Sequence, residues 1–129
     1  MTAPRRVQRT RRAGQPGMPP GARYVGRGTR WGNPSRVVYR KDSGGWHVET
    51  DHGSGVGTWP DPAGARRFAT EAYRAWIRQP EQADLRAAAR AELAGRDLAC
   101  WCPLPAPGVP DHCHAAVLLQ ISNSPAEVA

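Results

Sequence analysis

Acidic side chains are missing from the first forty residues of this chain, although eleven Asp and Glu occur in the remaining positions. The same forty residues contain ten arginines, and the whole chain has a formal charge of +7. Codon usage explains why arginine takes the place of lysine, which occurs once, but it does not explain the absence of acids. A segment that carries only positive charge favours an anionic partner, such as a nucleotide or a nucleic acid.

Long apolar runs are missing as well. No stretch approaches the about 20 apolar residues that span a membrane, and the charged N-terminus is not followed by the apolar run of a secretory signal. Hydrophobic residues make up 40% of the chain and charged residues 22%, as in ordinary globular proteins. We therefore expect a cytoplasmic protein without a membrane partner, and a length of 129 residues suits one domain.

Cysteine is scarce, and its number is odd, which argues against a disulfide framework in a reducing compartment. The three cysteines, Cys100, Cys102 and Cys113, all lie within one short segment near the C-terminal end. Two of the four histidines, His112 and His114, lie there too. Such a concentration of soft ligands favours a metal site or a reactive thiol.

The hydrophobic periodicity predicts a small mixed β-sheet with packed helices. Strands are expected within 7–11, 22–25, 36–40, 46–50 and 97–101, and helices over about 61–78, 81–94 and 113–121. Asp61-Pro62 is a typical helix start, and Gly95 is a typical residue after a helix end. The fold class is α/β, with α+β as the alternative, in a single compact domain.

We expect the α/β domain to span residues 23–123. A basic segment, residues 1–22, precedes it and consists of an edge strand and a loop rich in Pro and Gly. Residues 124–129 form a tail, and residues 51–57 read as a glycine-rich connection after a hairpin.

The predicted strand 97–101 is short, apolar and flanked by helices, which is typical of a central strand in an α/β layer. Because side chains alternate along a strand, Cys100 and Cys102 point the same way, and Trp101 points the opposite way. Ligands of such sheets bind beyond the carboxyl ends of the strands, and Cys102 lies at that end.

A glycine-rich loop, residues 26–34, follows the strand predicted at 22–25. Its glycines allow tight turns and a close approach to a ligand, and backbone amides in such loops bind phosphate. The arginines suit phosphate or carboxylate, the tryptophan a base or ring, and the asparagine an amide edge. The alternative is a tight turn with the tryptophan packed in the core and the asparagine as a turn cap. The candidate ligand-binding residues are Arg27, Arg30, Trp31 and Asn33.

Three interpretations of the cysteine segment stay open. In the first, Cys100, Cys102 and Cys113 bind a metal, with zinc expected from its ligand preference and with His114 or His112 as the fourth ligand. In the second, Cys102 is a catalytic thiol, and His114 or His112 is its base. In the third, the segment is structural, with Cys100 as a small buried hydrophobic residue and His114 satisfied locally.

The sequence contains four characteristic segments: Val25-Gly26-Arg27, Trp31-Gly32-Asn33-Pro34, Leu98-Ala99-Cys100-Trp101-Cys102 and Cys113-His114-Ala115. Together they resemble a small bacterial and phage family that is known as a domain of unknown function and named only by a serial number. The resemblance extends over nearly the whole chain and includes the basic N-terminal segment. It implies a cytosolic bacterial protein with one compact domain and no established activity. The chain departs from the family in a longer segment between Cys102 and Cys113 and in an apparent insertion at 51–60.

Two hypotheses of function follow. In the first, a nucleotide or a similar phosphorylated ligand binds in one pocket between loop 26–34 and the Cys102/Cys113-His114 unit. If the protein acts on that ligand, Cys102 and His114 are the catalytic candidates. In the second, the chain is a nucleic-acid-binding accessory protein with a basic N-terminal surface and a structural zinc or cysteine cluster. The residues do not define a reaction type, and whether the chain is an enzyme stays open.

Overall fold

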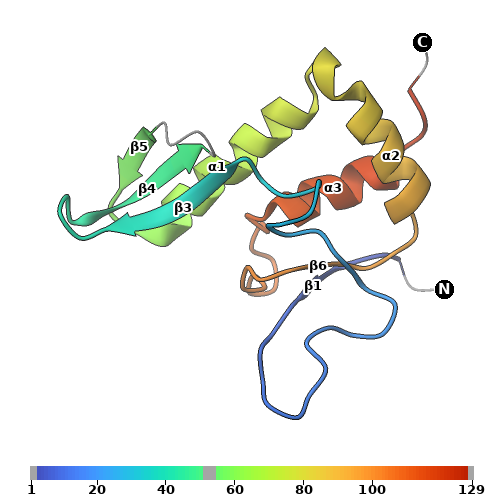
Figure 1. Cartoon of the computed structure of the whole chain (residues 1–129), viewed down its shortest axis with the longest axis horizontal. Helices are drawn as coiled ribbons and strands as arrows, with labels where there is room; N and C mark the ends of the chain where they lie inside the picture. The colour runs from blue at the N-terminus through green and yellow to red at the C-terminus, as the bar shows by residue number, and fades with distance from the viewer. Residues whose placement is uncertain (1–2, 51–54, 128–129) are drawn as a thin grey trace.

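A computed structural model describes residues 3–50 and 55–127 (Figure 1). In these residues five short strands come first, three helical segments follow, and a sixth strand precedes the last helix. The elements are β1 (Arg6–Gln8), β2 (Arg23–Tyr24), β3 (Ser35–Arg40), β4 (Gly45–Thr50), β5 (Gly55–Trp59), α1 (Pro62–Ile77), η1 (Pro80–Gln82), α2 (Ala83–Leu93), β6 (Leu98–Cys100) and α3 (His114–Ser122).

One sheet is parallel and has the strand order β1-β6-β2. Strand β6 is therefore interior, as predicted for residues 97–101, and β1 lies at an edge. All three strands run in one direction, so their carboxyl ends meet at one edge of this sheet. The segment between β1 and β2 extends away from the helices (Figure 1).

The other sheet is antiparallel, with the order β3-β4-β5, and it contains the predicted hairpin. The strands therefore divide between two small sheets and do not share one mixed sheet, while the α/β class and the single compact domain are confirmed. Strand β5 occupies part of the segment that was predicted as a connection, and that part of the prediction is wrong. The strand was missed because glycine is unusual inside strands. Here a Cβ at Gly57 would lie 2.8 Å from the Trp59 ring, so a glycine is needed inside the strand. Residues 51–54 lie outside the described part of the chain.

Helix α1 connects the two sheets. Asp61 caps it by accepting a hydrogen bond of 2.9 Å from the Gly64 amide, and Pro62 is its first residue, as predicted. Its buried positions recur at helical spacing and face the core. These positions are Ala65, Ala69, Thr70, Tyr73 and Ile77.

The second predicted helix, 81–94, divides into η1 and α2. The backbone of Gln82 leaves the helical region at φ −100° and ψ 11°, which separates the 3-10 turn from the α-helix. Gly95 follows α2 with a φ of +75°, as a left-handed helix stop requires. Among the described residues, none of the helices combines the length and the apolar character needed to cross a membrane.

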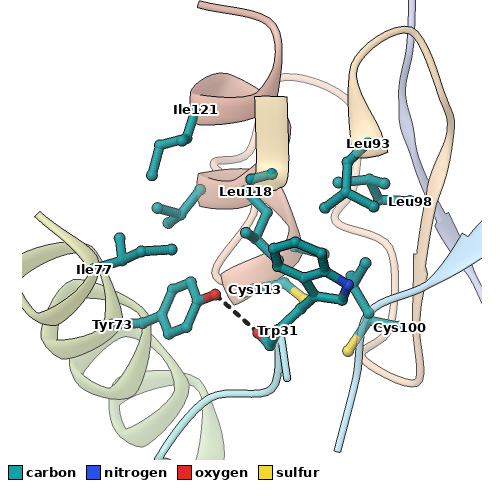
Figure 2. Packing of buried hydrophobic residues seen from close by; sticks show 13 residues of the cluster. Trp31, Tyr73, Ile77, Leu93, Leu98, Cys100, Cys113, Leu118 and Ile121 are labelled. Carbon is teal, nitrogen blue, oxygen red and sulfur yellow. Dashed lines mark hydrogen bonds between the residues drawn. The ribbon is translucent and has the colours of Figure 1, made fainter. Parts of the chain in front are cut away.

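The main hydrophobic core lies among α1, α2, α3 and the parallel sheet (Figure 2). Trp31 is at its centre and is 2% exposed, and its carbonyl accepts a hydrogen bond of 2.8 Å from the Tyr73 hydroxyl. A smaller cluster around Val48 lies between α1 and the antiparallel sheet. The larger cluster also contains Cys100 and Cys113, so the cysteine segment is part of the core.

The C-terminal segment is attached to α2. The Glu127 carboxylate accepts hydrogen bonds of 2.8 Å from Arg86 and from Arg90. These bonds, above all the one from Arg86, lower the pKa of Glu127 to about 2. The predicted tail, 124–129, is therefore held at Glu127, and residues 128–129 lie outside the described part.

Candidate metal and anion site

The site lies where the three parallel strands end. The amide of Arg9, just after β1, donates to the carbonyl of Cys100, and the amide of Val25, just after β2, donates to that of Ala99. The chain turns away from the sheet directly after these bonds. Because ligands of α/β proteins bind at this edge, the position agrees with the expectation for Cys102.

Three sulfurs converge at this edge. The Sγ atoms of Cys100, Cys102 and Cys113, which we call the cysteine cluster, all lie within 4.8 Å of one another. Those of Cys100 and Cys102 are 3.8 Å apart. A tetrahedral zinc with bonds of about 2.3 Å to sulfur separates two sulfurs by about 3.8 Å. The cluster therefore has the spacing of a metal site, and Figure 2 shows two of its sulfurs beside Trp31.

The thiols of the cluster control one another's ionisation. Hydrogen bonds from Cys102 and Cys113 lower the pKa of Cys100, so Cys100 carries the first negative charge. The hydrogen bond to Cys100 raises the pKa of Cys102 to about 11, and the pKa of Cys113 is raised for the same reason. Without a cation the cluster therefore holds one thiolate, whereas a bound divalent cation deprotonates coordinating thiols.

His114 is the first residue of α3, which Cys113 precedes as the N-cap. Its ring is buried, and Nε2 lies 2.8 Å from the carbonyl oxygen of Val25. A carbonyl only accepts, so Nε2 carries the proton in the neutral ring, and Nδ1 keeps its lone pair. Nδ1 lies 4.0 Å from the Sγ of Cys113. Metal-binding histidines commonly use one ring nitrogen as a ligand and donate from the other to a carbonyl.

A cavity of about 250 Å³ opens over the cluster. Two of the predicted ligand-binding residues in loop 26–34, Arg27 and Asn33, lie along it with the cluster and with His112 and His114. The structure therefore brings loop 26–34 and the cysteine segment together in one cavity. Arg36 of β3 and Arg66 of α1 complete the basic part of the wall.

The last two arginines were not among the candidates from the sequence. Arg36 lies in the strand predicted at 36–40, and Arg66 lies in the helix predicted at about 61–78. They reach the cavity because α1 packs on β3, a long-range contact that no local motif announces. No Asp or Glu from the described residues lines this cavity.

Two other predicted ligand-binding residues lie outside the cavity lining. Arg30 is ion-paired with Glu92 and lies 4.5 Å from the centre of the Trp31 ring. Trp31 itself is buried in the core, which agrees with the alternative stated for it. Neither side chain is placed to contact a ligand in the cavity.

Asn33 has a structural task in the loop. Its Nδ2 donates to the carbonyl of Ala69 at 3.0 Å, and its Oδ1 accepts from the Ser35 amide at 2.9 Å. The side chain therefore caps the turn and attaches the loop to α1, which positions Arg27 at the cavity. Gly26 is also required, because a Cβ there would lie 2.5 Å from the Tyr24 hydroxyl.

A buried arginine holds the segment between the second and third cysteines. The guanidinium of Arg6 makes two hydrogen bonds of 2.8 Å to the Asp111 carboxylate. It also donates to the carbonyls of Cys102, at 2.5 Å, and Pro103, at 2.8 Å. Sequence reasoning included Arg6 in the basic N-terminal segment, whereas its side chain is only 4% exposed. The contact fixes Cys102 and the approach to Cys113 from the neighbouring strand.

A family model matches residues 7–124. The chain belongs to the family described as domain of unknown function DUF4326. The resemblance inferred from the sequence motifs is thereby confirmed, and membership of DUF4326 supplies no activity. Neither curated proteins nor solved structures provide a match.

In this DUF4326 member, soft metal ligands and fixed positive charge meet in one cavity. Cys100 and Cys113 are buried, and Cys102 is half-buried. A metal ion on the three sulfurs would lie in the wall of the cavity, within reach of a bound ligand. The first turn of α3 starts at the same place, and the positive end of its helix dipole adds a favourable field for an anion.

Proposed function

We propose that this protein binds a phosphorylated small molecule of the nucleotide type, beside a zinc ion held by Cys100, Cys102 and Cys113. One observation carries the proposal: the same cavity is lined by three arginines and by all three cysteines. The site thus combines the donors that bind phosphate with the donors that bind zinc.

The anion part of the proposal rests on convergence. Arg27, Arg36 and Arg66 come from a loop, a strand and a helix, and all three reach one cavity. Guanidinium groups bind phosphate oxygens through two parallel hydrogen bonds, and they do so more strongly where water is partly excluded. Their convergence suits the several oxygens of a phosphate group.

The metal part rests on the chemistry and spacing of the donors. Three thiolates select a soft or borderline ion, and zinc is the common one in proteins. His114 offers Nδ1 for the fourth position, with its other nitrogen already fixed by Val25. Where a ligand or water takes that position instead, the ion polarises a bound oxygen. Reduced thiols of this kind fit a cytoplasmic protein.

A free catalytic thiol is the less favoured use of the cluster. Catalytic cysteines have a lowered pKa, because the thiolate is the nucleophile. Cys102 is the least buried of the three cysteine residues, yet its hydrogen bond with Cys100 raises its pKa to about 11. The least buried cysteine is therefore a poor nucleophile, whereas metal binding suits all three.

Calorimetric titration with a nucleoside monophosphate tests the proposal. The Arg36→Ala/Arg66→Ala variant should bind more weakly by at least about 1.5–3 kcal/mol, the value of one charge-assisted hydrogen bond. Arg30→Ala is the matched control, since it removes an arginine from the same region but outside the cavity lining, and it should bind like the wild type. Equal affinities for the wild type and the double variant would overturn the proposal.

A further inference from the structure

An exposed tryptophan lies at the rim of the cavity. Trp101 follows β6, is 38% exposed and forms part of the cavity wall. Its two chain neighbours, Cys100 and Cys102, belong to the cysteine cluster. Folding and metal binding use those neighbouring cysteines and make no demand for a large ring at this position. A solvent-exposed indole beside a ligand cavity is therefore a candidate contact surface.

Two arginines lie on this ring. The guanidinium carbons of Arg9 and Arg11 are 5.1 Å and 5.2 Å from its centre, and Arg9 also lies 4.6 Å from the centre of the Tyr24 ring. Within residues 3–50 and 55–127, neither arginine has an acidic partner. The surface thus alternates aromatic rings with positive charges that no acidic side chain of the described residues neutralises.

The surface and the cavity are continuous. Arg9 follows β1, Tyr24 ends β2 and Trp101 follows β6, so the three parallel strands deliver these side chains to the edge at which the cavity opens. Trp101 belongs to both, because it contacts the arginines and lines the cavity. A ligand that occupies the cavity and extends outward would therefore pass over its ring.

We propose that the ligand of the cavity is the end of a single-stranded nucleic acid, an inference that rests on the proposed function. The terminal nucleotide lies in the cavity with its phosphate on the cavity arginines. The next base stacks on Trp101, and the following phosphates contact Arg9 and Arg11. Aromatic rings beside arginines are the usual means of binding single strands, because every base has a flat face and every linkage has a charge.

Two other ligand forms fit the surface less well. A free mononucleotide occupies a cavity of about 250 Å³ but leaves Arg9 and Arg11 without a phosphate partner. A duplex hides the faces of its bases, so an exposed ring has nothing to stack on. An unpaired strand end uses both parts of the surface.

The test compares a 5′-phosphorylated ten-nucleotide single strand, as DNA and as RNA, with a nucleoside monophosphate and with a blunt duplex. Fluorescence anisotropy measures the oligonucleotides, and calorimetry measures the mononucleotide. We expect at least one of the single strands to bind tighter than both the mononucleotide and the duplex. Trp101→Ala should weaken single-strand binding by about 5- to 150-fold, the effect of losing one stacked base, and should weaken mononucleotide binding by a smaller factor, because a mononucleotide has no second base to stack on the ring. Trp101→Phe, which keeps a flat ring, should restore much of the affinity.

The arginines are tested by charge and by salt. Arg9→Ala/Arg11→Ala should flatten the dependence of log affinity on log salt concentration by about 1.4, as expected for two phosphate contacts with a single strand. The matched control, Lys41→Ala/Arg78→Ala, also removes two exposed positive charges but away from this edge, and it should keep the wild-type slope.

The outcomes separate the two proposals. If the mononucleotide binds through Arg36 and Arg66 but Trp101→Ala has no effect on the single strand, this inference fails and the proposed function stands. If the single strand depends on Trp101 but not on the cavity arginines, the proposed function fails, and the placement of the terminal nucleotide fails with it. A duplex that binds as tightly as the single strand also contradicts the inference.

Discussion

Arg6 and Asp111 form two hydrogen bonds of 2.8 Å each, although 105 positions separate them in the sequence. The arginine belongs to the edge strand of the parallel sheet, and the aspartate lies just before the third cysteine. Their contact closes the segment that connects Cys102 to Cys113. The geometry of the cysteine cluster therefore depends on a residue near the other end of the chain.

Removing Arg6 should destabilise the fold. Arg6→Ala leaves Asp111 and the carbonyls of Cys102 and Pro103 without their donor, and breaking such a buried pair costs about 3–5 kcal/mol. Urea unfolding measures the resulting decrease in the free energy of unfolding. Arg5→Ala is the control, because that side chain is 77% exposed, and it should change the free energy of unfolding by less than about 1 kcal/mol. Equal effects for the two variants would show that the contact does not hold the segment.

Tyr73→Phe tests whether the hydrogen bond from Tyr73 to the Trp31 carbonyl stabilises loop 26–34. The variant loses the hydrogen bond to the Trp31 carbonyl and leaves that buried acceptor unpaired, which costs about 1–3 kcal/mol. Tyr39→Phe removes the same hydroxyl from an exposed side chain and should be neutral. Thermal unfolding distinguishes them, and an unchanged midpoint for Tyr73→Phe would contradict the structure.

The C-terminal attachment should weaken in acid. The folded-state pKa of Glu127, about 2, is below the value near 4.5 of a free carboxyl, so the contact contributes stability above the free value. That stability is lost as the pH falls from about 4.5 toward 2, where the folded carboxylate is protonated. Glu127→Gln should therefore lower the unfolding temperature at pH 6 and have almost no effect near pH 2. A difference that is constant with pH would rule out the ion pairs with Arg86 and Arg90.

Local signals in the sequence predicted the framework well. Asp61-Pro62 marks the start of α1, and a short apolar run between helices identified β6 as an interior strand. Both depend on residues that are neighbours in the chain. The concentration of cysteines was also visible in the sequence, because all three sulfurs come from one strand–loop–helix unit.

Features that depend on tertiary packing were not predictable in this way. Arg6 reads as one more charge in a basic segment until β1 pairs with β6 and buries it. In the sequence, Arg66 looks like a solvent-exposed charge on the flank of a helix. The packing of α1 on β3 brings it to the cavity. In the sequence, Trp31 fitted a ligand-binding position and a core position equally well. Only its burial in the structure decides for the core.

Metal content gives a direct check on the cluster. Purified protein should contain about one equivalent of zinc, and Cys113→Ser should lose both the metal and stability, because metal binding is linked to folding. His112→Ala should keep the metal, because the histidine nitrogen that lies 4.0 Å from the Sγ of Cys113 belongs to His114. Fully folded protein that remains free of metal after incubation with zinc would exclude the site.

The visible absorption spectrum of the Co²⁺-loaded protein, titrated with a nucleoside monophosphate, tests most directly whether metal and anion share one cavity. One equivalent of Co²⁺ should produce strong thiolate charge-transfer bands, because three sulfurs surround the ion. Addition of the mononucleotide should then shift the ligand-field bands, since its phosphate binds beside the metal. A spectrum without thiolate bands, or one that the bound mononucleotide leaves unchanged, would contradict the shared site.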